Sequence, residues 1–466
     1  MKSPFHIAML ACVFLLSGCA LSQTVKEVFA YPTTAPVPTS TPTQGRDGSL
    51  YTTVSGFGTT SNNGSVLKTL IGLKGSRVIH AFSTSDGTNP EAGLTLAIDG
   101  DFYGVTTFGG SSEAGVLFKI TAGGTYTILH EFSGQSDGGY PVPSPVQASD
   151  GNLYGATGIG SLDGGTIYRF NPLTSTFTTI FSFSPNGSQG KQISAPLMQG
   201  SDGNLYGVTV AGGTNSCGTV FVISTSGSLL QTYSFPCGAG GSSPVSPLVQ
   251  APDGNFYGTT LLGGNISSQG ECKPGCGTIF RMTNGVVSTL YSFSGFPNDG
   301  DLQYGLTLGS DGNLYGVSGA GGLQDLGTLY EISTNGQYKL LYSFVKEIGS
   351  NPSAPMLQDT TGKFYGTAGR GGRNGQGSLY SLDMGLGPFI ALVRYTGRIG
   401  QSMQILGQGM TGLTAVTING VAATTFKVVS DTYMTAIIPT GATTGPVVVN
   451  TPKGTLTSNH SLRIVQ

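Results

Sequence analysis

Short apolar runs bounded by glycine, asparagine, aspartate and serine recur through the middle of the chain. One unit contains four such runs, and three of them are Asn204 to Thr209, Gly218 to Ile223 and Leu229 to Phe235. Each run is rich in β-branched or aromatic residues, which is typical of strands in an antiparallel meander. The pattern therefore predicts an all-β fold built from repeated four-stranded sheets.

The repeat is marked by the motif Asp-Gly-Asn-Leu-Tyr-Gly, which is complete at Asp150 to Gly155, Asp202 to Gly207 and Asp311 to Gly316. With its weaker versions, seven units begin at residues 47, 99, 150, 202, 253, 311 and 361. Four strands in about 51 residues suit one blade of a β-propeller, whose closure removes exposed sheet edges. We predict a seven-bladed propeller over residues 47–386. The first unit lacks a clear first strand and the last lacks a clear fourth strand. Seven blades are complete if the two chain ends share one blade, and six blades are the alternative.

The recurring aspartates have a structural explanation. Aspartate before glycine supplies a hydrogen-bond acceptor in a tight turn, and glycine supplies the positive φ. A calcium site is the alternative, but it needs several converging oxygen ligands. We interpret six residues as turn aspartates: Asp47, Asp99, Asp150, Asp202, Asp253 and Asp311.

Small residues follow each motif tyrosine by three positions, as expected for a crowded innermost strand. Five of them carry hydroxyl groups, namely Thr106, Thr157, Thr209, Thr260 and Ser318. On an innermost strand they would line the central channel as a weakly polar ring that holds water or a small polar ligand. Steric crowding alone is the other explanation for their size.

The start of the chain has the features of an export signal. Lys2 precedes the apolar run Ile7 to Leu16, which is too short to span a bilayer. The run ends in Leu16-Ser17-Gly18-Cys19, which resembles the bacterial lipobox. The resemblance implies a lipoprotein signal peptide over residues 1–18 and a lipid on Cys19 that holds the protein on a membrane without crossing it. No aspartate follows Cys19, which favours the outer membrane or cell surface. A cleaved secretory signal is the alternative.

Residues 19–46 contain the stretch YPTTAPVPTSTPTQ, in which four prolines lie among threonines. This composition favours an extended, polyproline-like spacer. We predict a Pro/Thr-rich tether that holds the folded part away from the lipid surface.

Charge and motif content exclude several function classes. Only 9% of the residues are charged, the net charge is −2 and no basic stretch occurs, which argues against a nucleic-acid partner. Metalloprotease, nucleophile-elbow and phosphate-loop motifs are missing from the sequence. We therefore predict no catalytic residue, cofactor or metal. His80 and His130 occupy an aromatic position of the repeat, so we interpret them as structural, with a metal ligand or a general base as the alternative.

Four cysteines follow the signal and lipid positions: Cys217, Cys237, Cys272 and Cys276. An even number in an exported chain indicates disulfides. We favour the local pairs Cys217–Cys237 and Cys272–Cys276. A zinc site is the alternative, although the usual ligand spacing is missing.

The motifs Asp-Gly-Asn-Leu-Tyr-Gly, Gly-Gly, Gly-Thr-(Val/Ile)-Phe and Leu-Tyr-Ser-Phe recur in this order over about residues 47–382. Together they resemble the exported tandem-repeat family called GloVer. The family is known for surface export with varied anchors and has no established activity to transfer. Residues 387–466 change pattern and read as short strands, including Val416 to Gly420 and Gly445 to Val449. They look like an IPT/TIG domain, an immunoglobulin-like β-sandwich.

These features predict a lipid-anchored protein of the cell envelope that acts as a non-catalytic binding or scaffolding module for a glycan or an envelope protein. We expect binding by the variable loops near the Gly-Gly pairs, at residues 109–115, 263–276 and 321–326. One alternative is a propeller-type metal-dependent lyase or lactonase, whose strands carry a similar motif. A purely structural envelope component is the other.

Overall fold

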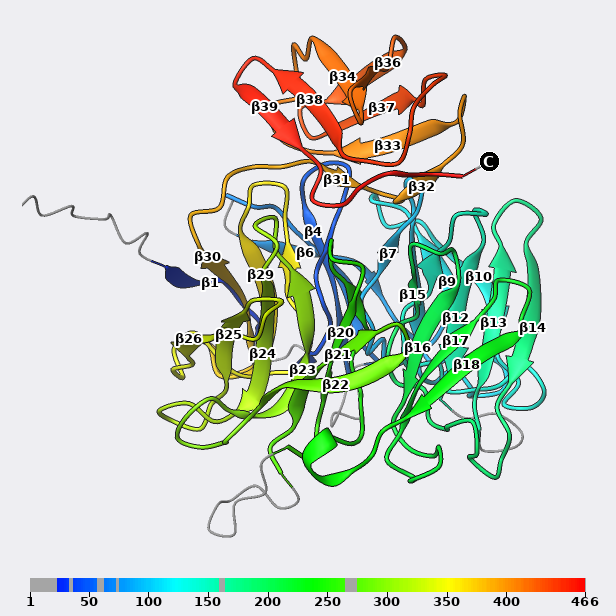
Figure 1. Ribbon diagram of the computed structural model, residues 1–466, viewed down its shortest axis with the longest axis vertical. Helices are drawn as coiled ribbons and strands as arrows, with labels where there is room; N and C mark the ends of the chain where they lie inside the picture. Colours follow the sequence, from blue (N-terminus) through cyan, green and yellow to red (C-terminus); the bar gives the residue numbers. More distant parts are fainter. Residues whose placement is uncertain are drawn as a thin grey trace, which may run out of the picture.

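The computed structural model describes residues 23–32, 37–56, 63–72, 75–158, 164–264 and 275–465. Within these ranges the elements are β-strands apart from one 3-10 turn at Gly238–Gly240, so the all-β prediction is confirmed (Figure 1). None of the described segments forms a helix that is long and apolar enough to cross a bilayer. The strands up to Asp383 form propeller-like antiparallel sheets, and those from Ala391 form a smaller group at the top of Figure 1.

Five sheets have four strands each, which lie side by side in the order in which they follow along the chain. The second sheet contains β7 (Thr95–Leu96), β8 (Phe102–Thr106), β9 (Val116–Ile120) and β10 (Tyr126–Glu131), and the third contains β11 (Val146–Gln147), β12 (Leu153–Thr157), β13 (Thr166–Asn171) and β14 (Thr176–Ser182). The fourth sheet contains β15 (Met198–Gln199), β16 (Leu205–Thr209), β17 (Thr219–Ile223) and β18 (Leu229–Ser234), and the fifth contains β19 (Val249–Gln250), β20 (Phe256–Thr260), β21 (Thr278–Thr283) and β22 (Val286–Ser292). The sixth sheet contains β23 (Asp301–Leu308), β24 (Leu314–Ala320), β25 (Thr328–Ile332) and β26 (Tyr338–Ser343).

The first and last sheets of the repeat region have five strands each. The first sheet contains β2 (Val37–Pro38), β3 (Thr43–Gln44), β4 (Leu50–Ser55), β5 (Ser65–Thr69) and β6 (Ser76–Ala81). The seventh contains β27 (Ser350–Pro352), β28 (Leu357–Gln358), β29 (Phe364–Arg370), β30 (Ser378–Asp383) and, as its outer strand, β1 (Thr24–Ala30). The start of the chain thus supplies the fourth strand that the last repeat lacks.

The prediction of a tether over residues 19–46 is wrong for the part that the structure describes. β1 pairs antiparallel with β30, with Thr24 opposite Asp383 and Ala30 opposite Ser378. Tyr31, directly after β1, is only 1% exposed. The prolines did not prevent pairing because strands tolerate proline at their ends and edges, where no backbone N–H is required.

Glutamines three residues before the motif aspartates join neighbouring sheets. The Oε1 atom of Gln199 accepts a hydrogen bond from the Ser149 N–H at 2.8 Å, and its Nε2 donates to the Ser149 hydroxyl at 3.1 Å. Gln250 and Gln358 repeat this arrangement with the serines of their preceding sheets. Gln44 of the first sheet accepts from the Thr360 N–H of the seventh at 3.1 Å, so these two sheets are also neighbours.

The motif aspartates hold both a turn and a tyrosine. In the third sheet, Asp150 accepts the Asn152 N–H at 3.0 Å and the Tyr154 hydroxyl at 2.7 Å. The hydroxyls of the corresponding tyrosines donate to the other turn aspartates at 2.7–2.9 Å, namely Asp47, Asp99, Asp202, Asp253 and Asp311. These contacts account for the Asp and Tyr of the repeat in structural terms, as the turn interpretation predicts.

The hydrophobic core of the repeat region lies between successive sheets. One cluster joins Tyr154 and Phe183 of the third sheet to Leu205 and Phe221 of the fourth, all at most 1% exposed. Both faces of an inner sheet are buried in this way, which explains why apolar residues do not alternate strictly with polar ones.

Two further sheets form a sandwich after Ala391. One contains β31 (Ala391–Leu392), β33 (Ser402–Leu406), β36 (Phe426–Ser430) and β37 (Tyr433–Ile437); the other contains β34 (Ala415–Ile418), β35 (Val421–Ala422), β38 (Val447–Thr451) and β39 (Gly454–Thr457). β32 (Thr396–Gly397) pairs with β40 (Arg463–Ile464) in parallel. Ile405 and Met434 of the first sheet pack with Val416 and Val449 of the second in one buried core.

The sandwich sits on the end of the repeat sheets that carries the Asp-Gly turns (Figure 1). The Thr432 hydroxyl donates to the Arg46 carbonyl oxygen at 2.7 Å, and the Phe389 N–H donates to the Thr360 carbonyl oxygen at 3.2 Å. The Arg46 guanidinium lies 4.5 Å from the centre of the Tyr433 ring. Asp-Gly turns join the first strand to the second, whereas Gly-Gly loops join the second to the third. The Gly-Gly loops therefore lie at the opposite, uncovered end, which we call the loop face.

Candidate functional site

A cavity of about 1340 Å³ lies among the first strands of the seven repeat sheets. Each of these strands supplies at least one side chain to the wall: Thr43, Leu96, Val146, Met198, Val249, Leu306 and Leu357. Six of these seven side chains are apolar, because a leucine, valine or methionine stands shortly before the motif turn in every repeat except the first. A cavity of this size and character is the default candidate for a ligand-binding site.

The sandwich covers one end of this cavity with charged and aromatic side chains. Arg394, Tyr395, His460 and Arg463 belong to the lining, and all four come from the segments around β32 and β40. Glu91 is the acidic residue of the lining, and burial raises the pKa of its carboxyl group. The sandwich therefore adds positive charge to a wall that is otherwise mainly apolar and uncharged.

Arg394 is a buried cation without an acidic partner at ion-pair distance among the described residues; it is 8% exposed. Its Nε donates to the Thr396 carbonyl oxygen at 2.9 Å and its Nη1 to the Ser149 carbonyl oxygen at 3.3 Å. Burial lowers the pKa of the guanidinium, and the negative charge of Asp150 acts in the opposite direction. The Asp150 carboxylate already accepts hydrogen bonds from Tyr154 and Asn152.

Tyr395 and His460 form an aromatic pair at the covered end, with ring centroids 4.4 Å apart. Tyr395 is 48% exposed although burial raises the pKa of its hydroxyl. Both observations fit a Tyr395 side chain that projects into the cavity. There, protein atoms surround the ring on all sides, but part of its surface touches none of them. Burial also lowers the pKa of His460 to about 4, so the imidazole is neutral at pH 7.

The prediction that five hydroxyl residues line the channel is wrong. Thr106, Thr157, Thr209, Thr260 and Ser318 are each 0% exposed. In the third sheet, the Thr157 hydroxyl accepts the Thr166 N–H at 3.0 Å and shares a 2.9 Å hydrogen bond with the Thr166 hydroxyl. The innermost strand of each sheet is the one before the motif turn, so these residues lie one strand further out, in the interior of the sheet.

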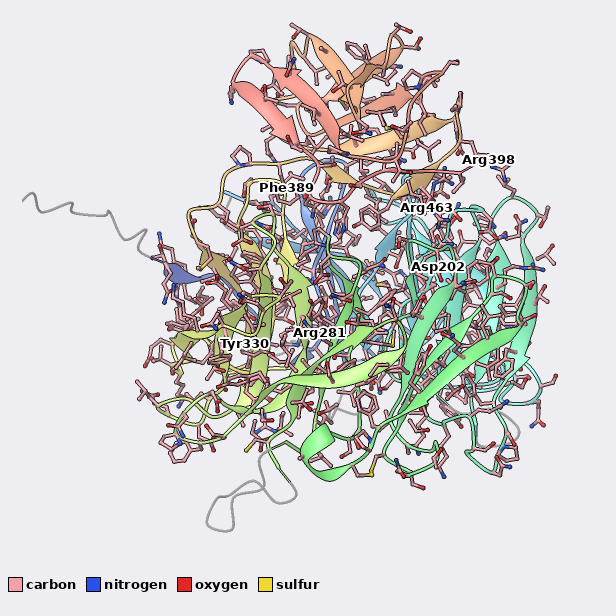
Figure 2. The ribbon with its side chains drawn as sticks, viewed as in Figure 1. Asp202, Arg281, Tyr330, Phe389, Arg398 and Arg463 are labelled. Carbon is pink, nitrogen blue, oxygen red and sulfur yellow. A yellow bond between two sulfur atoms is a disulfide. The ribbon has the colours of Figure 1, made fainter. Side chains whose placement is uncertain are left out.

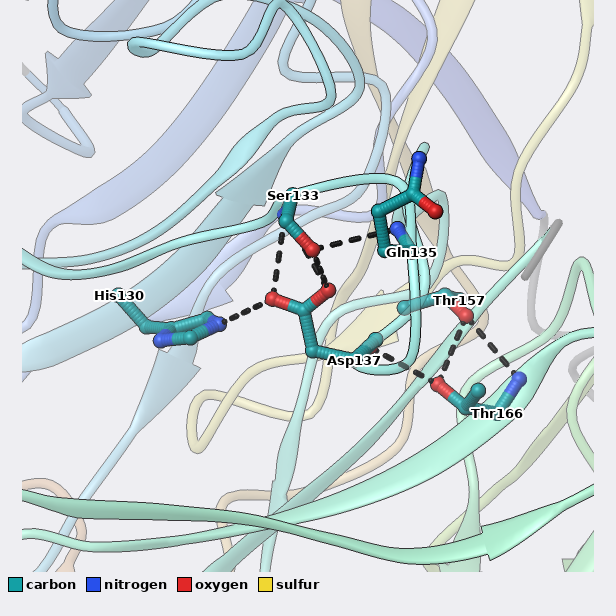
Figure 3. A network of polar contacts seen from close by, with 6 residues as sticks. All are labelled: His130, Ser133, Gln135, Asp137, Thr157 and Thr166. Atoms are coloured by element: carbon teal, nitrogen blue, oxygen red, sulfur yellow. Dashed lines mark hydrogen bonds and ion pairs between the residues drawn. The ribbon is translucent and has the colours of Figure 1, made fainter. Parts of the chain in front are cut away.

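His130 takes part in a turn network rather than in the cavity wall (Figure 3). Its Nε2 lies 3.0 Å from the Asp137 carboxylate, which also accepts from the Ser133 N–H and hydroxyl. The Asp137 carbonyl oxygen accepts from the Thr166 hydroxyl at 3.2 Å, which links this turn to the next sheet. The ring stacks on Phe177 with centroids 3.6 Å apart, and burial lowers its pKa.

His80 and Tyr291 occupy the same position in other sheets. His80 Nε2 lies 3.2 Å from the Asp86 carboxylate, and the Tyr291 hydroxyl donates to Asp299 at 2.5 Å. A tyrosine can thus replace the histidine, which supports the structural interpretation of both histidines.

The cysteines form a disulfide within one sheet region. Cys217 and Cys237 are bonded, as the local pairing predicts. Cys276 is also disulfide-bonded and buried, while its predicted partner Cys272 lies outside the described residues, as does Cys19. Within the described ranges, no three His, Cys, Asp or Glu side chains come together as a metal site.

The loop face carries an exposed aromatic pair that the sequence analysis missed. Phe108 and Tyr140 are each 37% exposed and meet edge to face, with ring centroids 5.4 Å apart. They lie beside the predicted binding loop at residues 109–115. A signal was available, because Phe108 directly precedes a Gly-Gly pair, where Ala211 and Ala320 stand in other repeats. The second predicted loop, at residues 263–276, is described only at its two ends.

Comparison with known proteins identifies the repeat. A family model described as the Gloeobacter/Verrucomicrobia repeat matches residues 38–271 and 266–421. None of the curated proteins matches the chain in sequence. Among solved structures, the extracellular domain of a protein described as a hybrid two-component system from B. thetaiotaomicron aligns with a TM-score of 0.51 and 11% identity, over 92% of this chain and 52% of that one.

Two further solved structures align less well. A fungal alcohol oxidase in complex with copper has a TM-score of 0.46 and 14% identity, over 95% of this chain and 99% of that one. A protein described as a 6-phosphogluconolactonase from Bacteroides uniformis has a TM-score of 0.44 and 15% identity, over 66% and 85%. The chain spans about half the length of the B. thetaiotaomicron structure, and identities this low concern the fold alone.

Proposed function

Because the chain belongs to the Gloeobacter/Verrucomicrobia repeat family, we propose that it is an exported, lipid-anchored, non-catalytic binding protein of the bacterial cell envelope. In this proposal the repeats form a seven-bladed β-propeller, and the C-terminal sandwich is an IPT/TIG-type, immunoglobulin-like module that covers one end of it. The ring is supported by the Gln44–Thr360 hydrogen bond and by the Thr367 hydroxyl, which donates to the Ser40 carbonyl oxygen at 2.9 Å. Both contacts join the first sheet to the seventh.

The observation that carries the binding function is the exposed aromatic pair on the loop face. Phe108 and Tyr140 leave more than a third of their surface in water, and this exposed aromatic area is available to a ligand. Aromatic side chains with one polar end are enriched at binding surfaces because they combine apolar area with a hydrogen-bonding group. The sandwich covers the other end of the sheets, so a large ligand reaches the propeller on this face. A glycan suits the site, because the C–H face of a sugar ring packs on an aromatic ring.

The double substitution Phe108→Ala and Tyr140→Ala should weaken glycan binding without unfolding the protein. Truncating two central aromatic contacts is expected to weaken binding at least tenfold, or more than about 1.4 kcal/mol. The measurement is a glycan array with the purified protein, followed by titration of the glycan that binds. Leu173→Ala is the matched control, because Leu173 is 95% exposed on a hairpin at the opposite end of the sheets.

Equal glycan affinity of the double variant and the control would contradict the assignment of this face. Capture of an envelope protein instead of a glycan, lost in the same double variant, would keep the face and change the ligand class. A protein that binds neither class would be a purely structural component.

The proposed anchor is a lipid on Cys19, five positions before the first residue of β1, Thr24. Five extended residues span at most about 17 Å, so the seventh sheet would lie close to the membrane. Cys19→Ser should abolish incorporation of labelled palmitate and release the protein from the membrane fraction. Processing of the unchanged protein should stop in the presence of globomycin. If neither Cys19→Ser nor globomycin changes the processing and release of the protein, the signal is a cleaved secretory signal instead.

The proposal of a non-catalytic role is supported by the charge content of the cavity. The lining consists mainly of apolar and uncharged polar residues, and Glu91 is its one acidic residue among those that the structure describes. Stoichiometric metal in the purified protein, measured by elemental analysis, would favour the metal-dependent lyase or lactonase instead.

A further inference from the structure

The cavity wall is suited to a long apolar chain. Leu96, Met198, Leu306, Met356 and Leu357 belong to its lining. Its volume of about 1340 Å³ exceeds the roughly 300–1000 Å³ of ordinary small-molecule pockets. Burying an apolar chain against such a wall yields about 25 cal/mol for each Å² removed from water.

Two cations stand at the covered end of the same cavity. Arg394 is buried and has no acidic partner at ion-pair distance among the described residues. The Arg463 side chain takes part in none of the hydrogen bonds or ion pairs found in the described part of the chain, and its Nη1 reaches over the turn at Gly203. A buried guanidinium is costly unless an anion compensates it. An acidic group bound here would supply that compensation.

Part of the cavity lining is exposed at the side, between the sandwich and the turns of the fourth and fifth sheets. Ser201, Pro252, Gly254 and Ser461 line the cavity and are exposed. Hydrogen bonds join the sandwich to the turn regions of the first, third and seventh sheets through Arg46, Ser149 and Thr360. In the described ranges, none joins it to the turns of the fourth and fifth sheets at Asp202 and Asp253. Figure 2 shows Arg463 at this junction, near Asp202.

We propose that the central cavity binds an anionic amphiphile, such as a long-chain carboxylate or an alkyl phosphate. The apolar chain enters first and lies along the seven inner strands. The acidic head stays at the junction, where Arg394 and Arg463 bind it and the neutral Tyr395–His460 pair packs beside it. The cavity lining includes neither Phe108 nor Tyr140, so the proposal goes beyond the binding function described above and does not depend on it.

Titration calorimetry with three probes tests the proposal: palmitate, hexadecyl phosphate and the uncharged hexadecanol. The protein is the chain from residue 19 onwards with Cys19→Ser, which removes the site of its own lipid. Palmitate and hexadecyl phosphate should bind one to one, and hexadecanol at least tenfold more weakly. The tighter of the two acidic probes distinguishes a carboxylate from a phosphate head group.

Arg394→Gln and Arg463→Gln should each weaken palmitate binding about tenfold, as expected for losing one charge-assisted hydrogen bond of about 1.4 kcal/mol. Hexadecanol binding should not change. Arg398→Gln is the matched control, because Arg398 is exposed on the sandwich and outside the cavity lining (Figure 2). Met198→Gln, in the wall, should weaken palmitate and hexadecanol alike.

Thermal unfolding of every variant separates loss of the site from loss of the fold. Since Arg463 is partly exposed, its variant should remain folded even if Arg394→Gln does not. The proposal is overturned if folded Arg463→Gln binds palmitate as the unchanged protein does, or if palmitate and hexadecanol bind equally. It is also overturned if neither acidic probe binds. A glycan that still binds the loop face in that case would leave the proposed function intact.

Discussion

Deletion of residues 23–31 should leave the protein unable to fold, so that it is recovered as aggregate or unfolded chain. β1 forms the outer strand of the seventh sheet and pairs with β30 along its length. Tyr31 packs with Leu50 of the first sheet and Leu379 of the seventh in one buried cluster. The deletion would remove the contacts that join the two ends of the repeat region and would expose the edge of β30 to other chains.

Point substitutions separate the buried contact from the strand itself. Tyr31→Ala should lower the free energy of unfolding by about 3–5 kcal/mol, the usual cost of truncating a fully buried aromatic residue. Lys26→Ala is the matched control on the same strand, because Lys26 is exposed and surface substitutions usually change stability by less than about 0.5 kcal/mol. Urea unfolding followed by circular dichroism measures both. Similar midpoints for the two variants would show that the start of the chain does not hold the seventh sheet together.

Removal of the Cys217–Cys237 disulfide should lower the free energy of unfolding by about 3 kcal/mol. The bond closes a loop of 20 residues, and its loss restores conformational entropy to the unfolded chain. Replacing both cysteines by serine avoids a free thiol. The measurement is thermal unfolding of the unchanged protein and the double variant, each with and without a reducing agent.

The reducing agent should lower the melting temperature of the unchanged protein more than that of the double variant. Any sensitivity that remains in the variant belongs to the bond of Cys276. An unchanged protein that melts at the same temperature with and without the reducing agent would contradict the prediction.

Local features of the fold could be predicted from the sequence. Asp150 and Tyr154 are four residues apart, and the turn between them brings carboxylate and hydroxyl together within one hairpin. Cys217 and Cys237 flank one pair of strands, so their pairing also depends on residues close together in the sequence. The family was recognisable for the same reason, because each motif recurs inside a single repeat.

The candidate sites were less predictable. The sequence pattern predicts that Thr157 lies on the innermost strand of its sheet, whereas β11 is innermost and Thr157 lies on the next strand, β12. Tyr31 and Gln44 were placed in a tether because their partners, Leu379 and Thr360, lie more than 300 residues away. Arg394 gave no signal of a binding site, since its neighbour Ser149 belongs to a different part of the chain.

The amino-acid sequence by itself determined the all-β class, the repeat and its period, the Asp-Gly turns and the pairing of Cys217 with Cys237, because each depends on residues close together along the chain. Only the tertiary structure decided that the first strand completes the last sheet, which strand lines the cavity, and that Arg394 closes one end of it. The physical reason is that side chains from distant segments become neighbours only when hydrophobic burial packs the sheets against one another.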